Sequence, residues 1–299
     1  MCIEIQLCGY NREFMVVGLN SLFSALFAGI VAIAVTVAIE RLGGIKGGIL
    51  GTMPSTIVPA AIGIWLATNM NAVDFREAMG VVPLGLILNA GFLWLWRVIP
   101  EYIPNFKLSL KLTLIASLSL SIWFFAAIIS IIFSENMLKR GVNPLILGLV
   151  GQIIGIIIGI LACLKPIEAP KGKHEVGKIV LITRGLAAGC AIGIAVQLAE
   201  IGNPLASGVA SIFPAIFTTS MIALWVSQGR AVPAGAIGPM MLGAMSVSSC
   251  ALFYALLFPI MAVNILGLIS ATILGWVLSV IIITIPSWYW LSSKKPISA

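Results

Sequence analysis

Charged side chains are scarce in this sequence. Asp, Glu, Lys and Arg make up 9% of its 299 residues, whereas hydrophobic residues make up 60%. A soluble domain carries about 25% charged residues, and a run of about 18 apolar residues is long enough to span a bilayer as a helix. Several runs exceed that length, so the composition predicts an all-α polytopic protein embedded in the lipid bilayer. The net charge of +7 implies no nucleic-acid partner, because membrane proteins accumulate Lys and Arg on one side of the membrane.

Residues that carry enzyme chemistry are also few. The one histidine, His174, and the one aspartate, Asp74, both fall in polar segments. A lone aspartate excludes an intramembrane aspartyl dyad and the aspartate-rich metal sites of prenyl transfer. The sequence contains neither an HExxH zinc motif nor a Walker loop, and its five cysteines have no metal-ligand spacing. We therefore expect neither an enzyme nor a bound metal or organic cofactor.

Nine apolar spans are expected along the chain, in an arrangement of four, one and four. We place them at residues 14–40, 45–67, 78–96, 108–133, 142–164, 179–199, 205–226, 234–258 and 260–285. The predicted organisation is an N-terminal extramembrane segment (1–13), a first four-helix repeat (14–133), a connecting helix with a cytoplasmic loop (134–177), a second four-helix repeat (178–286) and a cytoplasmic tail (287–299). The first 13 residues lack a basic region and a cleavage site, so we expect the first span to be retained.

The distribution of Lys and Arg predicts the orientation of these spans. With nine spans, 12 basic residues fall on the side of the C-terminus, and four fall on the side of the N-terminus, namely Arg12, Arg76, Lys139 and Arg140. Basic residues are enriched on the cytoplasmic side. We therefore expect a multi-pass protein of the cell membrane with its C-terminus in the cytoplasm and its N-terminus outside.

One stretch of the sequence occurs twice. Residues 40–65 align with residues 200–225 at a shift of 160, and the alignment extends upstream to give 8 identities over positions 26–65, where about 3 are expected by chance. Pro54 falls on Pro214 and Trp65 on Trp225. Downstream, residues 78–85 match residues 236–243 at a shift of 158. We interpret the two four-span groups as copies of one unit.

Two four-span copies that are separated by a single span enter the membrane from opposite sides. The predicted fold is therefore two inverted four-helix repeats joined by a central helix. Inverted repeats are typical of secondary transporters, in which broken helices at matching positions of the two halves form the site. The second and seventh spans are that pair, because each contains glycines followed by a proline.

The backbone chemistry of these two spans predicts a binding site. Pro54 and Pro214 have no N–H, so each leaves a carbonyl without its helical partner, and freed backbone groups in hydrocarbon must be satisfied by protein, water or ligand. Hydroxyl groups follow each proline. The predicted substrate-binding residues are Gly48, Gly51, Pro54, Ser55, Thr56, Gly208, Pro214, Thr218, Thr219 and Ser220. The alternative is that these small residues serve helix packing, as they commonly do in membranes.

Two glutamates adjoin the apolar spans, and a carboxylate there needs a partner or a function. We predict ion coupling by Glu40 and Glu200, with Gln197 one turn before the latter; the alternative is that both acids are span-end residues. On the sixth span, Gly185, Gly189 and Gly193 share a helical face with Glu200. On the first span, Ala25 and Gly29 share a face with Glu40. Gly151, Gly155 and Gly159 predict a tightly packed central span.

Three functions fit this pattern. The leading hypothesis is a secondary transporter or facilitator of a small molecule or ion that works by alternating access. The second is a membrane subunit or scaffold without transport, which binds partner helices, including further copies of itself, through its small-residue faces. The third, a membrane enzyme acting on lipid, is disfavoured by the scarcity of acid–base groups. Polar groups that converge inside the protein favour transport, whereas outward-facing small residues favour a scaffold.

Overall fold

The structure is a computed structural model that describes residues 19–34, 53–104, 106–164, 177–228 and 231–293, and all regular structure in these ranges is helical. Seven described segments are helical, long and apolar enough to cross a membrane, which supports a multi-pass membrane protein; two of them, Pro204–Val226 and Ile265–Ser292, each combine shorter helices. Two further apolar helices are shorter, Leu19–Ala34 and Ile57–Ala67. Glu40, Gly48 and Gly51 lie outside the described residues.

The helices follow the predicted order of spans. Before the central helix come Leu19–Ala34, α3 (Ile57–Ala67), α4 (Ala72–Tyr102) and α5 (Leu108–Lys139). The central helix is α6 (Pro144–Ala162). After it come α7 (Lys178–Glu200), α8 (Pro204–Ala210), α9 (Ala215–Gln228), α10 (Ala231–Met261), α11 (Ile265–Ser279), a π-helical turn (Val280–Thr284) and α12 (Ile285–Ser292).

Asparagine side chains determine where four of these helices begin. Asn71, Asn143, Asn203 and Asn264 precede α4, α6, α8 and α11, and each accepts a backbone N–H from the first turn, at 2.8–3.1 Å for the best bond. A side-chain oxygen at this position satisfies one of the N–H groups that a helix start leaves without a partner.

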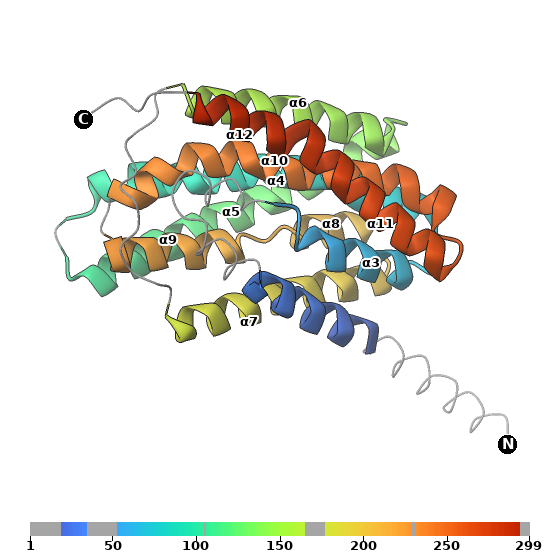
Figure 1. Cartoon of the computed structure of the whole chain (residues 1–299), viewed down its shortest axis with the longest axis horizontal. Helices are drawn as coiled ribbons and strands as arrows, with labels where there is room; N and C mark the ends of the chain where they lie inside the picture. Colours follow the sequence, from blue (N-terminus) through green and yellow to red (C-terminus); the bar gives the residue numbers. More distant parts are fainter. Residues whose placement is uncertain (1–18, 35–52, 105, 165–176, 229–230, 294–299) are drawn as a thin grey trace, which may run out of the picture.

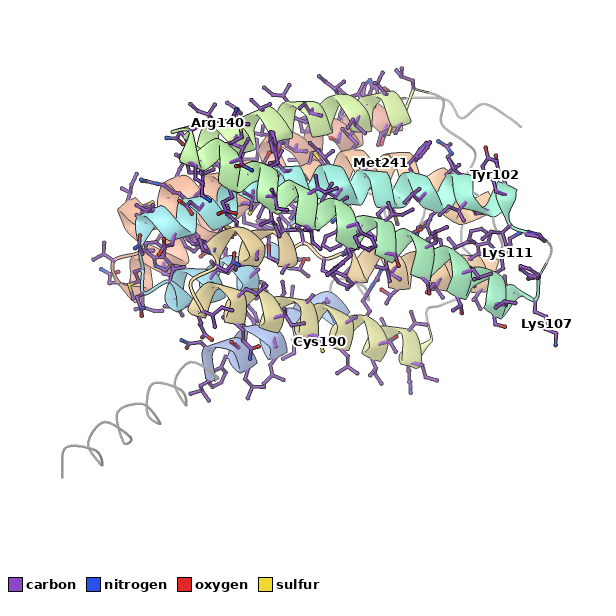
Figure 2. All side chains as sticks on the ribbon, turned by 180° about the vertical axis from the view of Figure 1, so that it is seen from behind. Tyr102, Lys107, Lys111, Arg140, Cys190 and Met241 are labelled. Atoms are coloured by element: carbon purple, nitrogen blue, oxygen red, sulfur yellow. The ribbon has the colours of Figure 1, made fainter. Side chains whose placement is uncertain are left out.

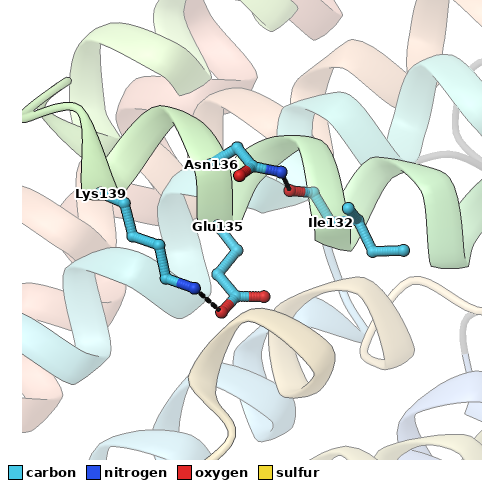
Figure 3. A network of polar contacts seen from close by, with 4 residues as sticks. All are labelled: Ile132, Glu135, Asn136 and Lys139. Atoms are coloured by element: carbon cyan, nitrogen blue, oxygen red, sulfur yellow. Dashed lines mark hydrogen bonds and ion pairs between the residues drawn. The ribbon is translucent and has the colours of Figure 1, made fainter.

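Several helices extend beyond the predicted boundaries, as α5 and α12 illustrate. α5 continues through Glu135 to Lys139, past the predicted span end at 133, and α12 continues to Ser292, past the predicted tail start at 287. At the end of α5, Lys139 donates to Glu135 one turn earlier at 2.6 Å, and Asn136 donates to the carbonyl of Ile132 (Figure 3). Pairs at this spacing support a helix in water, so the helix extends beyond the apolar residues.

α4 and α10 form the centre of the bundle, between α6 on one side and α7 on the other (Figure 1). They run in opposite directions, because Arg76 near the start of α4 donates to the carbonyl of Ala255 near the end of α10. A cluster of buried rings lies at this end, where the ring of Phe75 stacks on Phe258 at 5.2 Å and meets Trp65 edge-on at 5.0 Å. These contacts bring the two halves of the chain together.

The outer helices expose apolar side chains. On α5, Phe125 and Ile129 are about two-thirds exposed, and on α11 the exposed fraction of Leu266 is 72%. Exposed apolar surface of this extent is unfavourable in water but matches the hydrocarbon of a bilayer. These helices therefore face lipid, whereas α4 and α10 are shielded from it.

The glycines of α6 let the central helix approach both α4 and α10. From its start to its end, Pro144 and Gly148 lie against Gly80, Gly151 against Leu84, Gly155 against both Ile87 and Met245, Gly159 against Leu242, and Ala162 against Gly238. The residues on α4 and α10 are matched by the 158-residue shift: Gly80 with Gly238, Leu84 with Leu242 and Ile87 with Met245. The order of contacts therefore reads the same from both ends of α6, with Gly155 in the middle.

A second contact has the same reciprocal form. Gly29 and Gly185 lie against each other's carbonyl groups, and Gly189 lies against the carbonyl of Ala25. At the shift of 160, Ala25 corresponds to Gly185 and Gly29 to Gly189, so exchanging the two copies maps one contact onto the other. The small-residue faces predicted on the first and sixth spans thus pack against each other within one chain.

Close packing of α8 on α4 predicts a large effect of one methyl group. A Cβ at Gly208 would overlap the backbone oxygen of Ala78, which cannot move aside as a side chain can. We expect Gly208→Ala to lower the free energy of unfolding by roughly 1–3 kcal/mol or more, as overpacking does. The matched control is Gly91→Ala in α4, because a Cβ there meets nothing within 4 Å. Unfolding by SDS titration measures both; equal midpoints for the two variants would contradict this packing.

Candidate functional site

The predicted seventh span is broken in its middle. α8 ends at Ala210 and α9 begins at Ala215, and the intervening residues 211–214, which end in Pro214, are not helical. The connector lies at mid-length of the bundle (Figure 1). Because Pro214 has no N–H, the carbonyl of Ala210 accepts from the N–H of Phe213 instead, at 3.0 Å. Ser211 Oγ donates to the carbonyl of Gly208 at 2.7 Å.

The other proline lies at a comparable place in the first half. Pro54 is buried, residues 53–56 are not helical, and α3 begins at Ile57. Both prolines therefore precede the start of a helix that carries the matching tryptophan, Trp65 or Trp225. In Figure 1, α3 and α9 start near the middle of the bundle and run toward opposite ends.

A buried polar chain holds the break between α8 and α9. Asn89 on α4 is 2% exposed, and its Nδ2 donates to the carbonyl of Ile212 at 2.8 Å. Its Oδ1 accepts from the indole Nε1 of Trp123 on α5 at 2.7 Å. The Trp123 ring also meets Phe213 edge-on, at 5.3 Å between ring centroids. We call Trp123, Asn89 and the carbonyl of Ile212 the Asn89 clasp; it ties the broken segment to two other helices.

Several predicted binding residues are engaged within the protein. Thr218 donates to the carbonyl of Pro214, just before α9, and within α9 Thr219 donates to the carbonyl of Ala215 and Ser220 to that of Ile216. Ser55 and Thr56 are half-buried next to Pro54. Gly208 lies directly on the backbone of α4, so packing already explains a glycine there. Of the predicted binding residues, Pro214 lies in the break between α8 and α9, and Pro54, Ser55 and Thr56 lie in the non-helical residues that precede α3.

Glu200 ends α7 and is half-buried. Ser21 Oγ donates to its Oε2 at 3.2 Å, while its Oε1 is buried and has no hydrogen-bond partner among the described residues. The described helices that pack against α7 carry no charged side chain; they are Leu19–Ala34, α3, α8 and α9. Among the described residues, this acid is therefore only half satisfied and faces no cation from the helices packed against it, so a proton or a small cation could satisfy its free oxygen.

Gln197 does not share this environment, because its side chain is exposed. Near Glu200, the hydroxyl of Ser24 instead lies against Gly63 of α3, where a Cβ would also meet Val196 of α7. The first, second and sixth predicted spans thus meet at a small polar junction formed by Ser21, Ser24 and Glu200.

Basic residues lie at both ends of the bundle, whereas most acidic residues gather at one end. Tyr102, Lys107 and Lys111 mark one end, whereas Arg140 marks the other (Figure 2). Acidic residues among the described part of the chain lie mainly near the Arg140 end, as the helix bounds place Asp74, Glu77, Glu135 and Glu200 there.

Sequence reasoning did not identify Asn89, Trp123 or Ser21. Asn89 is an isolated amide in an apolar run, ILNAGF, and such a residue within a span is a signal for a buried polar contact. In comparisons with protein-family models, curated proteins and solved structures, none matches this chain. The site is therefore interpreted from the residues of this chain alone.

Proposed function

We propose that the chain is a secondary transporter or facilitator of a small solute, built from two inverted four-helix repeats with α6 between them. The palindromic order of contacts along α6 is the observation that carries the proposal. A two-fold axis through Gly155 and perpendicular to α6 produces that order, and such an axis lies in the membrane plane when α6 crosses the membrane. Repeats related in this way can exchange conformations and so open a site to either side.

The broken helices support a site at mid-depth. The starts of α3 and α9 follow Pro54 and Pro214 near the middle of the bundle, and helix starts present N–H groups and a positive dipole end. Irregular backbone inside a membrane is tolerated where protein or a polar cavity satisfies it. We propose that solute contacts the backbone and hydroxyls around residues 53–56 and 211–214, and that Glu200 with Ser21 binds the coupling ion.

The scaffold alternative receives less support. It requires small-residue faces that are free to bind partner helices. Among the described residues, the glycines of α7 pack against the helix Leu19–Ala34, and those of α6 pack against α4 and α10. Both faces are occupied within one chain, so neither offers a surface to another protein.

Reconstitution into liposomes tests the proposal. The liposomes are incubated with a defined mixture of amino acids, carboxylic acids, sugars and nucleosides, and their contents are measured by mass spectrometry with and without proton or sodium gradients. We expect at least one solute to enter faster than into protein-free liposomes. Contents equal to those of protein-free liposomes under every gradient, with protein that remains folded, would contradict transport of these solute classes.

A further inference from the structure

The break between α8 and α9 is held by side chains that lie more than 80 residues away in sequence. The N–H groups of Ile212 and Phe213 donate to carbonyls in the last turn of α8, those of Val209 at 3.3 Å and Ala210 at 3.0 Å. The carbonyl of Ile212 instead accepts from Asn89, and the amide oxygen of Asn89 accepts from Trp123. One buried amide thus satisfies a backbone acceptor, and it is itself oriented by an indole donor.

The clasp has no chemical counterpart in the other half. At the 158-residue shift, Asn89 corresponds to Val247, which can neither donate nor accept through its side chain. The next residue, Ser248, is completely buried, and its hydroxyl has no partner among the described residues. Two halves that share packing along α6 therefore differ at this position, and in the described part of the chain the Asn89 clasp acts on the break between α8 and α9.

We propose that Asn89 is a positioning residue that fixes the α8–α9 break. The role in transport rests on the proposed function, since the break is its expected site. The positioning of the break by Asn89 does not depend on transport, because it concerns only the local opening of residues 211–214. Loss of the Asn89 donor leaves a buried carbonyl without a partner, which is more costly than the loss of a bond at the surface.

Hydrogen–deuterium exchange of the purified full-length chain measures this opening directly. We compare Asn89→Leu, which removes both bonds, and Asn89→Asp, which removes only the donor to Ile212. A third variant, Trp123→Phe, removes the indole donor but keeps a ring beside Phe213 and retains the amide of Asn89. The matched control is Thr284→Val, which removes another buried bond between helices, from Thr284 to Ser246, away from the break.

We expect amides of residues 211–216 to exchange about tenfold faster in both Asn89 variants, because a lost partner of a buried carbonyl raises the population of the open segment. Trp123→Phe should give a smaller increase and Thr284→Val none, while peptides covering 53–60 should stay unchanged in all four. Equal exchange at 211–216 in Asn89→Leu, Asn89→Asp and the wild type would overturn the proposal, as would an equal increase in Thr284→Val. If Asn89→Leu does not fold, the comparison of Asn89→Asp with the wild type decides, because that variant also removes the donor to Ile212.

Failure of the proposed function has a different signature. If the wild type moves no solute but the exchange pattern holds, Asn89 positions the break and transport is wrong. If the wild type moves solute and exchange at the break does not respond, the transport proposal stands and the role of Asn89 falls.

Discussion

Replacing both break prolines, in Pro54→Ala with Pro214→Ala, is expected to reduce solute uptake more than tenfold while the protein still folds. A proline in a helix interior costs about 3 kcal/mol, largely because it removes an N–H and clashes with the preceding turn. Alanine removes that penalty, so the N–H at position 214 can bond to the carbonyl of Ala210, and α8 can continue into α9. A change of 1.4 kcal/mol is a tenfold change in population, so closing two breaks is enough to abolish an open site.

The control for this result is Pro204→Ala. Pro204 is the first residue of α8, where the N–H has no helical partner in any case. The Pro204→Ala variant should therefore take up solute at the wild-type rate. Uptake by the double proline variant at the wild-type rate would show that the prolines serve packing only. The two single variants are expected to differ, because the Asn89 clasp opposes straightening at Pro214 and Asn89 is replaced by Val247 at the matching position of the other half.

Glu200→Gln is expected to separate coupling from movement of solute. One proton per solute supports about tenfold accumulation for each unit of pH difference, since a unit of pH is 1.36 kcal/mol. Glutamine keeps the size of the side chain and can still accept from Ser21, but it cannot bind and release a proton. We therefore expect an accumulation ratio near one in the variant, while exchange of labelled against unlabelled solute continues.

Glu135→Gln is the matched control, because Glu135 is exposed and paired with Lys139 on the surface (Figure 3). Such a pair contributes about 0.3–0.5 kcal/mol, so both accumulation and exchange should remain at wild-type levels. If the Glu200→Gln variant still accumulates solute against its gradient, Glu200 is a span-end residue without a role in coupling. The coupling ion would then have to bind elsewhere, at Glu40 or at the backbone of the breaks.

Local chemistry in the sequence predicted part of this fold well. The helical membrane class follows from composition, and the interruption at Pro214 follows from the missing N–H. The glycine faces on the first, fifth and sixth spans predicted close neighbours, and the structure contains them. Which residues these neighbours are could not be predicted. Gly29 meets Gly185 more than 150 residues away in the sequence, and only the tertiary packing brings the two positions together.

The site was less predictable, because it too depends on tertiary packing. A hydroxyl in a span can bond to its own helix or point into a cavity, and sequence does not distinguish the two; in α9 the hydroxyls of Thr218 and Ser220 bond to their own backbone. The role of Asn89 depends on the register between α4 and the break. The helices α5 and α12 extend past the predicted span ends at 133 and 285, because apolar composition, which defines a span, ends before the helix does.

The inverted arrangement is tested most directly by the sides of two matching loops. The loop after α4 contains Lys107, and the loop after α10 contains Val263, which is 79% exposed. Single cysteines at these two positions, in a chain without its native cysteines, are treated in intact cells with a membrane-impermeant maleimide. We predict that Val263→Cys is labelled from outside and that Lys107→Cys is labelled only after permeabilisation. Labelling of both cysteines from the same side would contradict two inverted halves around α6.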